Sequence, residues 1–335
     1  MIVEALVDSG LVPEPVLRAA IRRVCAARLR ACVRGGGLAA SERQRAFVEE
    51  LRAAPIAVAT EAANAQHYEV PADFFGLVLG PRRKYSSAYW PAGVATLAAA
   101  EEAMLELTAA RAGLADGQHI LDLGCGWGSF ALWAAARFPA SRITAVSNSR
   151  SQRAHIATTA LARGLPNLEV ITGDVRSLAL PAAAFDRVVS IEMFEHMRNY
   201  RALLARIAGW LAPRGSLFVH VFAHRRWAYP YDDAGASDWM AREFFTGGLM
   251  PSVPLFLHFQ DDLRVAEQWV LPGTHYARTA EAWHANLLAQ STAVTALLGR
   301  RHFHRWRVFF LACAELFGFA GGDEWVVAHH RFVRR

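Results

Sequence analysis

The segment Ile120-Leu-Asp-Leu-Gly-Cys-Gly-Trp-Gly128 decides the fold of this chain. Its first four residues are mostly apolar and predict a short buried strand, and its three glycines predict a tight turn directly after that strand. The segment Ser129–Arg137 that follows predicts a helix. A strand, a glycine turn and a helix N-terminus together form a cradle for a polar ligand, because backbone N–H groups come close there and the helix end carries partial positive charge.

The spacing of the glycines argues against a dinucleotide as that ligand. Gly124, Gly126 and Gly128 stand as G-x-G-x-G, whereas the dinucleotide fingerprint is G-x-G-x-x-G. The fingerprint also requires an acidic residue about 20 residues further on, and Ile143–Asn148 contains none. Asp122 instead suits an ammonium group and the turn amides suit a carboxylate, so we expect the methionyl part of S-adenosylmethionine here. The alternative is a tight strand–helix corner that binds nothing.

Length and composition indicate one large domain, or a domain with a cap. The chain has 335 residues, of which 53% are apolar, and this is enough for a sizeable packed core. No apolar run of 18 or more residues is free of charge, and the N-terminus lacks the pattern of a secretory signal. We therefore expect a cytoplasmic protein with at most peripheral membrane contact.

The basic charge balance carries little information about partners. The net charge is +6, and Lys84 is the only lysine, so arginine supplies nearly all basic groups, as in proteins from GC-rich genomes. Basic residues neither form runs nor alternate with aromatic residues, so we expect no nucleic-acid partner. The 4 cysteines and 13 histidines lack the spacing of metal ligands, and we expect no metal.

Three parts follow one another along the chain. Residues 1–95 are expected to form an N-terminal helical cap that contributes to the cofactor and substrate sites and offers a surface for a possible homodimer. Residues 96–225 alternate short apolar strands with helices, which predicts a Rossmann-like, doubly wound α/β core with a parallel sheet. Residues 226–335 depart from this alternation, and we expect a helical substrate lid there, followed by a helix and a strand that closes the core sheet.

Apolar periodicity sets the expected boundaries of the elements. Core strands are expected at His119–Leu123, Arg142–Ser147, Leu168–Thr172, Arg187–Ile191 and Ser216–Phe222. Helices are expected at Val16–Val33, Ser41–Ala53, Val94–Ala112, Ser151–Arg163, Tyr200–Leu211 and His302–Phe319. The lid region is expected to contain one strand, Leu263–Leu271, and the chain to end in an antiparallel edge strand, Trp325–Val333.

Polar residues directly follow the expected core strands. Since ligands of parallel sheets bind beyond the carboxyl ends of the strands, these residues should meet in one crevice. Asp174 is placed to accept a hydrogen bond from the adenine amino group, with Val175 beside it, although a carboxylate here can also simply cap the strand end. Asn148 and Gln152 follow the second strand, where ribose or head-group hydroxyls would lie.

The segment Ser190–Met197, which reads SIEMFEHM, follows the fourth strand. If it becomes helical, Glu192, Glu195 and His196 fall at i, i+3 and i+4 and share one helix face. Two carboxylates and an imidazole in one crevice would shift one another's pKa values. The alternative is an ordinary first helical turn, in which the acids only favour the helix dipole.

This trio suits methyl transfer to an amine. Transfer from a sulfonium is an in-line displacement, and a protonated amine must first lose its proton to expose a lone pair. Glu195 and His196 are the expected bases, and Glu192 would stabilise the methylated cation. Aromatic faces would add to that stabilisation, and the candidates are Tyr85, Tyr89, Trp239, Trp306 and Phe309, each of which can equally be an ordinary core residue.

Six motifs carry a resemblance to a known family. They are LDLGCGWG (121–128), IEMFEHMRNY (191–200), FFTGGLMPS (244–252), FQDD (259–262), HYARTAEAW (275–283) and ELFGFAGGDEWVVAHHRF (315–332). With them the chain resembles the cyclopropane fatty acid synthase superfamily of S-adenosylmethionine-dependent methyltransferases, and looks most like its coclaurine N-methyltransferase-like branch. The resemblance covers nearly the whole chain. It implies a class I methyltransferase fold, S-adenosylmethionine as cofactor and methylation of a small aromatic or cyclic amine.

The resemblance also implies roles for single residues. By matching motif, the cofactor would be bound by Tyr85, Ser86, Gly124, Gly126, Asn148, Gln152, Asp174, Val175 and Ile191, beside Asp122. Glu192, Glu195 and His196 match the catalytic group of the amine branch, and Trp306 and Phe309 match its aromatic substrate wall.

A second branch of the superfamily adds methylene groups to unsaturated acyl chains of phospholipids, and this is the alternative function. The chain is similar to that branch at Glu195, His220 and Tyr276, which there help to hold a bicarbonate base. Against it, Ser87 stands where that branch has cysteine, and Glu192 stands where it has glycine. A third possibility is a protein that binds the nucleoside without turnover, and the intact trio argues against it.

Overall fold

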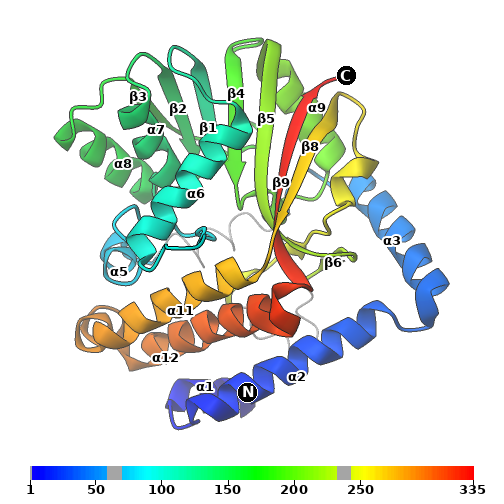
Figure 1. Cartoon of the computed structure of the whole chain (residues 1–335), viewed down its shortest axis with the longest axis vertical. Helices are drawn as coiled ribbons and strands as arrows, with labels where there is room; N and C mark the ends of the chain where they lie inside the picture. The colour runs from blue at the N-terminus through cyan, green and yellow to red at the C-terminus, as the bar shows by residue number, and fades with distance from the viewer. Residues whose placement is uncertain (1, 59–69, 232–242) are drawn as a thin grey trace.

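A seven-stranded sheet forms the centre of the molecule (Figure 1). The computed structural model describes residues 2–58, 70–231 and 243–335. The strand order is β3-β2-β1-β4-β5-β9-β8. Strands β1 to β5 are parallel to one another, which confirms the predicted doubly wound core. The bounds are β1 His119–Leu123, β2 Arg142–Ser147, β3 Leu168–Thr172, β4 Phe185–Ile191, β5 Leu211–His224, β8 Leu263–Leu271 and β9 Trp325–Arg334.

The last two strands differ from the expectation. We expected β9 at the sheet edge and β8 within the lid, but β9 pairs antiparallel with both β5 and β8, and β8 forms the edge of the main sheet. The reason is burial: Trp325–His330 are all buried, whereas most of β8 is half-buried or exposed. A strand that is apolar on both faces stays in the sheet interior, because an edge would leave its side chains in water.

Two layers of helices cover the sheet. Helices α6 (Leu97–Ala112), α7 (Ser129–Arg137) and α8 (Arg150–Ala162) pack on one face. Helices α3 (Gly36–Ala53) and α9 (Tyr200–Trp210) pack on the other. Successive side chains of a strand point to opposite faces of the sheet, so each strand packs against both helix layers. Val188 of β4 accordingly belongs to one apolar cluster and Val189 to the other.

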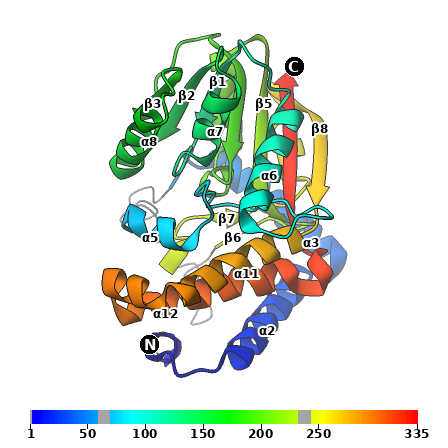
Figure 2. The same ribbon diagram turned by 60° about the vertical axis from the view of Figure 1, so that its left-hand side comes forward.

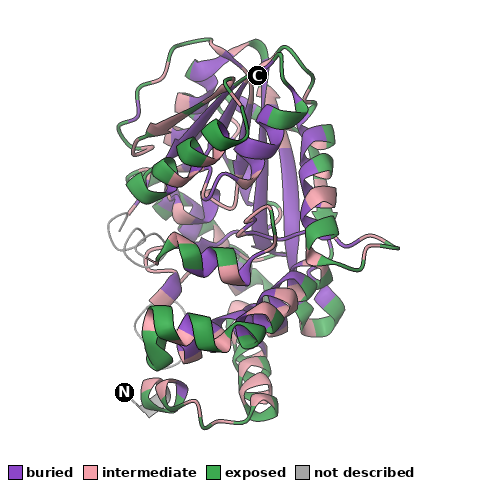
Figure 3. Cartoon of the chain, turned by 90° about the vertical axis from the view of Figure 1, so that its left-hand side faces the viewer, coloured by how far each residue is buried: buried purple, intermediate pink, exposed green. Residues whose placement is uncertain are grey.

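A third layer of helices lies beyond the carboxyl ends of the parallel strands (Figures 1 and 2). One large apolar cluster joins these helices to the sheet and to the loops that leave it. The layer consists of α1 (Ile2–Ser9), α2 (Glu14–Cys32), α5 (Ala72–Val78), α11 (Thr274–Ala289) and α12 (Ser291–Gly318). Buried residues accordingly concentrate in the sheet and on the inward sides of the helices (Figure 3).

Helix boundaries follow local chemistry. Helix α6 begins at Leu97, three residues later than expected, because the Thr96 hydroxyl accepts a hydrogen bond from the amide of Ala99 and caps the helix. Helix α3 begins at Gly36, earlier than expected, directly after the left-handed Gly35. Helix α12 is longer than expected and contains a non-helical residue at Gly299.

The remaining elements are short. They are β6 (Tyr229–Pro230), β7 (Leu249–Met250) and the 3₁₀ helices η1 (Phe194–His196), η2 (Leu255–His258) and η3 (Phe319–Gly322). None of the helices in the described part of the chain has both the length and the apolar character needed to cross a bilayer.

Candidate active site

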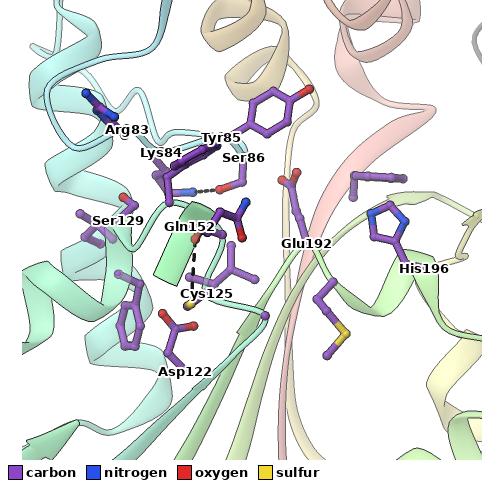
Figure 4. A pocket seen from close by; sticks show the side chains of 18 of the residues that line it. Arg83, Lys84, Tyr85, Ser86, Asp122, Cys125, Ser129, Gln152, Glu192 and His196 are labelled. Carbon is purple, nitrogen blue, oxygen red and sulfur yellow. Dashed lines mark hydrogen bonds between the residues drawn. The ribbon is translucent and has the colours of Figure 1, made fainter. Parts of the chain in front are cut away.

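A cavity of about 1010 Å³, including its open mouth, lies between the carboxyl ends of β1 and β4 and the helices α11 and α12 (Figure 4). Among the predicted site residues, the cavity is lined by Tyr85, Ser86, Asp122, Gly124, Gly126, Gln152, Ile191, Glu192, His196, Tyr276 and Phe309. The fold therefore brings most of the expected site together, from segments far apart in the sequence.

The glycine turn has the backbone that only glycine adopts readily. Gly124 has φ +86°, and a Cβ atom there would lie 2.6 Å from Cγ of Met193. Gly128 has φ +81°, and a Cβ atom there would lie 2.6 Å from Ile156 on α8. Gly126 has open space around its Cα atom within the described part of the chain. The turn is thus closed against the protein on two sides and open towards the cavity.

Fewer turn amides face the cavity than the sequence suggested. The amides of Gly124 and Cys125 both donate to the carbonyl oxygen of Val146, at 3.0 and 2.9 Å, and are already used by the sheet. In the described part of the chain, the amides of Gly126 and Trp127 are the ones left for a ligand. The first turn of α7 adds its positive helix end to them.

Asp122 is buried beside this turn. Its Oδ2 atom makes no hydrogen bond within the described residues. Burial raises the pKa of Asp122 to about 7, although the amide of Ala131 opposes the shift. An unpartnered buried carboxylate is costly unless a positive group meets it. Asp122 therefore fits the ammonium group of an amino-acid ligand.

A second hollow continues from the first and contains the other predicted cofactor residues. Asn148, Asp174 and Val175 line it, and it shares Gly124 and Gln152 with the first cavity. The Ser147 hydroxyl donates to Oε1 of Gln152 over 2.6 Å and orients that amide. Because they share lining residues, the two hollows are neighbours, and together they extend from the end of β3 to α12.

Asp174 already has a partner in this hollow. Arg176 donates to it from its amide at 2.8 Å and from Nη2 at 2.7 Å. Burial raises the pKa of Asp174, but the bonds from Arg176 outweigh it and hold that pKa below its usual value. Asp174 is therefore an anionic acceptor at neutral pH.

Glu192 adopts a left-handed backbone conformation with φ +48°, which is unusual for a residue other than glycine. Its amide still pairs with the carbonyl of His220, so the chain has not yet left the sheet at this residue. The side chain accepts hydrogen bonds from the Ser87 amide at 2.9 Å and the Tyr276 hydroxyl at 2.7 Å, and Nε2 of His220 lies 3.2 Å away. Burial raises the pKa of Glu192, while the charge of Lys84 opposes the rise.

The expected helix through Glu192, Glu195 and His196 does not form. The left-handed Glu192 interrupts it, and only the 3₁₀ turn Phe194–His196 follows. The three side chains therefore do not share one helix face. Glu195 lies behind the cavity wall, where Oε1 accepts from the Phe222 amide at 2.8 Å, and burial raises its pKa well above the usual value.

His196 faces the cavity (Figure 4). Its ring lies parallel to that of Phe245, with 6.2 Å between the ring centres. Burial lowers the pKa of His196 to about 4, so its imidazole is neutral at pH 7. A neutral imidazole at the cavity wall is able to accept a proton.

The structure separates the expected substrate residues. Tyr276 and Phe309 line the cavity, and Trp306 packs behind Phe309 with 5.5 Å between ring centres. Tyr89 is outside the lining, and its ring is tilted against that of His275, with 4.8 Å between the ring centres. His220 also lies outside it, buried behind Glu192, and Trp239 is outside the described residues.

Lys84 is a site residue that the sequence analysis missed. It is 2% exposed, lines the cavity and donates from Nζ to the hydroxyl of Ser86 and, at 2.8 Å, to the carbonyl of Ser87. Burial lowers its pKa to about 8, against the attraction of Glu192 and Glu101. Lys84 is the only lysine in the sequence. This was a signal of its role, but we attributed it to genome composition alone. The aromatic lining residues Trp127, Phe130, Phe245 and Trp283 were also missed.

The described residues contain no cluster of three or more histidine, cysteine, aspartate or glutamate side chains with the arrangement of a metal site. The polar groups that line the cavity are carboxylates, an imidazole, one ammonium and one guanidinium group, hydroxyl groups, a thiol and an amide, and aromatic rings lie among them.

Comparison with known proteins agrees with this geometry. The chain is 36% identical to (S)-coclaurine N-methyltransferase from Thalictrum flavum subsp. glaucum, over 100% of this chain and 96% of that protein. It is 28% identical to the cyclopropane-fatty-acyl-phospholipid synthase of Escherichia coli strain K12, over 80% of this chain and 67% of that protein.

A solved structure is similar throughout. The crystal structure of coclaurine N-methyltransferase bound to N-methylheliamine and SAH has a TM-score of 0.93 and 34% identity, and the match covers 98% of both chains. The family model of mycolic acid cyclopropane synthetase matches residues 58–323. These matches confirm the resemblance inferred from the six motifs. The chain belongs to the mycolic acid cyclopropane synthetase family, and it is an S-adenosylmethionine-dependent methyltransferase.

Proposed function

We propose that this methyltransferase transfers the methyl group of S-adenosylmethionine to the nitrogen of a small aromatic or cyclic amine. The observation that carries the proposal is the carboxylate of Glu192, which the protein holds by three contacts in a cavity that aromatic rings line in part. A buried anion among aromatic rings favours a positively charged guest.

The residues present fit the cofactor. The buried carboxylate of Asp122 has one oxygen, Oδ2, without a partner among the described residues, and this oxygen is available to the ammonium group. Gly126 has no side chain that would fill the space beside it. Asp174, Val175 and Asn148 line the hollow that would receive the nucleoside. When bound, S-adenosylmethionine supplies an electrophilic methyl group on a positively charged sulfur.

The chain's own residues then handle the proton and the charge. His196 is neutral at pH 7 and faces the cavity, and the charge of Glu192 opposes the fall in its pKa, so that a proton on the imidazole would be stabilised by this carboxylate. His196 is therefore the proposed base that takes the ammonium proton of the substrate. Glu192 stabilises the cationic product, and the rings of Tyr276 and Phe309 add cation–π attraction. We keep Glu195 in the proposed catalytic group as a buried acid behind this wall, where burial raises its pKa well above the usual value and favours its protonated form.

The contacts of Glu192 also bear on the lipid alternative. The resemblance assigned His220 and Tyr276 to holding a bicarbonate base in the lipid-modifying branch. Here both side chains, and the amide of Ser87, are directed to the carboxylate of Glu192. An anion already occupies their hydrogen bonds, which supports an amine acceptor over an acyl chain. Since the chain is also 28% identical to the phospholipid synthase, methylene transfer to lipid acyl chains is the second function to test.

One experiment compares the two acceptors. Purified protein and methyl-labelled S-adenosylmethionine are incubated with a panel of arylethylamines and tetrahydroisoquinolines, and in parallel with vesicles of unsaturated phospholipid. We expect labelled N-methyl products and unchanged acyl chains. Label in the lipid fraction without any N-methylated amine would overturn the proposal in favour of the alternative.

Three expectations from the sequence stay predictions. The first is the division into a cap, a core and a lid, in which α11 and α12 would cover the cavity. The second is a homodimer through the N-terminal helices, where Val16, Val24 and Leu38 are exposed. Sedimentation equilibrium tests it, and a monomer at all concentrations would contradict it. The third is a cytoplasmic location, which cell fractionation tests.

A further inference from the structure

A chain of hydrogen bonds leads from Glu192 across the neighbouring strands β5 and β9 to Arg111 on helix α6. Nε2 of His220 lies 3.2 Å from Oε1 of Glu192, and Nδ1 of His220 lies 3.0 Å from Nε2 of His329. Nδ1 of His329 lies 2.8 Å from Nη1 of Arg111. The guanidinium group of Arg111 stacks on Trp269, 5.1 Å from the ring centre.

We propose that Arg111 and His329 are positioning residues that fix the tautomer of His220 and thereby hold Glu192 in its ionised form. Neither residue lines the cavity, and both act through His220. This inference deepens the proposed amine methylation and rests on it for the kinetic part of its test.

The direction in which these hydrogen bonds are donated follows from Arg111, at the end of the series. Arginine has N–H donors only, so Arg111 must donate and Nδ1 of His329 must accept. The proton of His329 then resides on Nε2, which donates to Nδ1 of His220. By the same reasoning Nε2 of His220 carries its proton and donates to Glu192. The reverse order would require a lone pair on the guanidinium group, which has none.

The sheet supports this arrangement. His220 on β5 and His329 on β9 are register partners on adjacent antiparallel strands, so their side chains lie on the same face. Both are fully buried, and burial lowers the pKa of each well below its usual value. Two neutral imidazoles can transmit hydrogen-bond direction without bringing a second charge into the core.

This series of hydrogen bonds favours the ionised form of Glu192. A hydrogen bond donated to a carboxylate favours its charged form. Without His329, His220 is free to carry its proton on Nδ1 and to turn a lone pair towards Glu192, which would favour the protonated acid. The titratable and charged groups around Glu192 and His329 that also act there are Lys84, Glu195, His196, Tyr276, Cys313 and His330.

The kinetic test compares variants by the pH dependence of kcat. In His329→Leu and Arg111→Met, the acidic limb of the profile should move to higher pH, by about one unit or more in His329→Leu. His329→Gln should keep the limb of the wild type, because the amide can accept from Arg111 and donate to His220. His330→Leu is the matched control, since His330 adjoins His329 in sequence and contacts Gln268 and Val253 instead. An unmoved limb in both His329→Leu and Arg111→Met overturns the inference.

A spectroscopic test does not depend on turnover or on variants that fold. In protein with ¹⁵N-labelled histidine, the ring nitrogens of His220 and His329 should show a proton on Nε2 and a lone pair on Nδ1 between pH 6 and 8. A proton on Nδ1 of either ring overturns the inference. If no amine is methylated but both rings show the Nε2 proton, the proposed substrate class fails and the inferred hydrogen-bond direction stands.

Discussion

The hydroxyl group of Tyr276 donates a hydrogen bond of 2.7 Å to Oε2 of Glu192, across 84 positions of sequence. Tyr276 belongs to α11, and Glu192 directly follows β4. The contact therefore joins the helical layer to the carboxyl end of the sheet at the point where the proposed chemistry takes place. It also explains how a glutamate in a left-handed backbone conformation is held in place.

Removing the charge of Glu192 should abolish most of the turnover. In Glu192→Gln the shape is kept and the anion is lost, so we expect kcat to fall by roughly 10²- to 10⁴-fold. The Kd of S-adenosylmethionine, measured by calorimetry, should stay within a few-fold, because Asp122 and the glycine turn remain. A variant that turned over at the wild-type rate would show that this carboxylate has no role in the reaction.

Glu195→Gln is the matched comparison. The amide oxygen can still accept from the Phe222 amide, and burial raises the pKa of Glu195 well above its usual value, which favours the uncharged form that glutamine imitates. We expect kcat to stay within about tenfold of the wild type. A loss as large as that of Glu192→Gln would instead place Glu195 among the groups that accept the substrate proton.

The stability of the protein without ligand should respond to Asp122. This carboxyl ionises near pH 7 in the fold and at its ordinary pKa of 3.8 when unfolded. Between these values the folded state binds more protons, so its stability falls as the pH rises from 4 to 7. Asp122→Asn removes this dependence and should be more stable than the wild type at pH 8, by up to about 4 kcal/mol.

Paired urea unfolding curves at pH 4 and pH 8 measure the effect of Asp122→Asn, since all other groups are common to both proteins. The same variant should bind S-adenosylmethionine more weakly, because the carboxylate proposed for its ammonium group is gone. Equal stability differences at the two pH values would contradict the assigned pKa.

Asp174 and Arg176 should affect cofactor binding in opposite directions. Asp174→Ala removes the proposed acceptor for the adenine amino group and should raise the Kd about tenfold, with kcat at saturation little changed. Arg176→Ala releases the carboxylate from its ion pair of 2.7 Å and should lower the Kd. Calorimetric titration of both variants decides, and equal weakening in both would indicate a structural role for the pair.

Replacing the buried lysine should act through Glu192. The charge of Lys84 opposes the rise in the pKa of Glu192. In Lys84→Met that pKa should rise further, so kcat should fall by roughly tenfold at pH 6.5 and recover in part at pH 8.5. Arg82→Met is the control, since Arg82 is paired with Glu102 outside the cavity. A loss that is the same at both pH values would point to packing instead of charge.

Local patterns predicted the framework well. The bounds of β1, β2, β3 and β8 are those expected from apolar periodicity, and the glycine turn follows β1 as the sequence indicated. These features depend on neighbours within a few residues, which the sequence displays directly. The positions of Gly124 and Gly128 also follow from local backbone geometry, because their positive φ angles exclude most other residues.

Interactions between distant segments could not be predicted in this way. A helical spacing of Glu192, Glu195 and His196 was plausible until the pairing of the Glu192 amide with β5 and its left-handed backbone interrupted the helix. The interior position of β9 likewise depends on β8 forming the edge of the sheet.

The amino-acid sequence by itself determined the succession of core strands and helices along the chain, the glycine turn and the family, since short segments of sequence are enough to recognise each of these. The tertiary structure alone decided which groups become charged or neutral. Folding brings Lys84 to Glu192 and His196 from a segment more than 100 residues earlier in the chain. The pKa values of all three are set by the burial and the neighbours that folding creates. Desolvation and pairing depend on distance in space, and neither is visible in the linear chain.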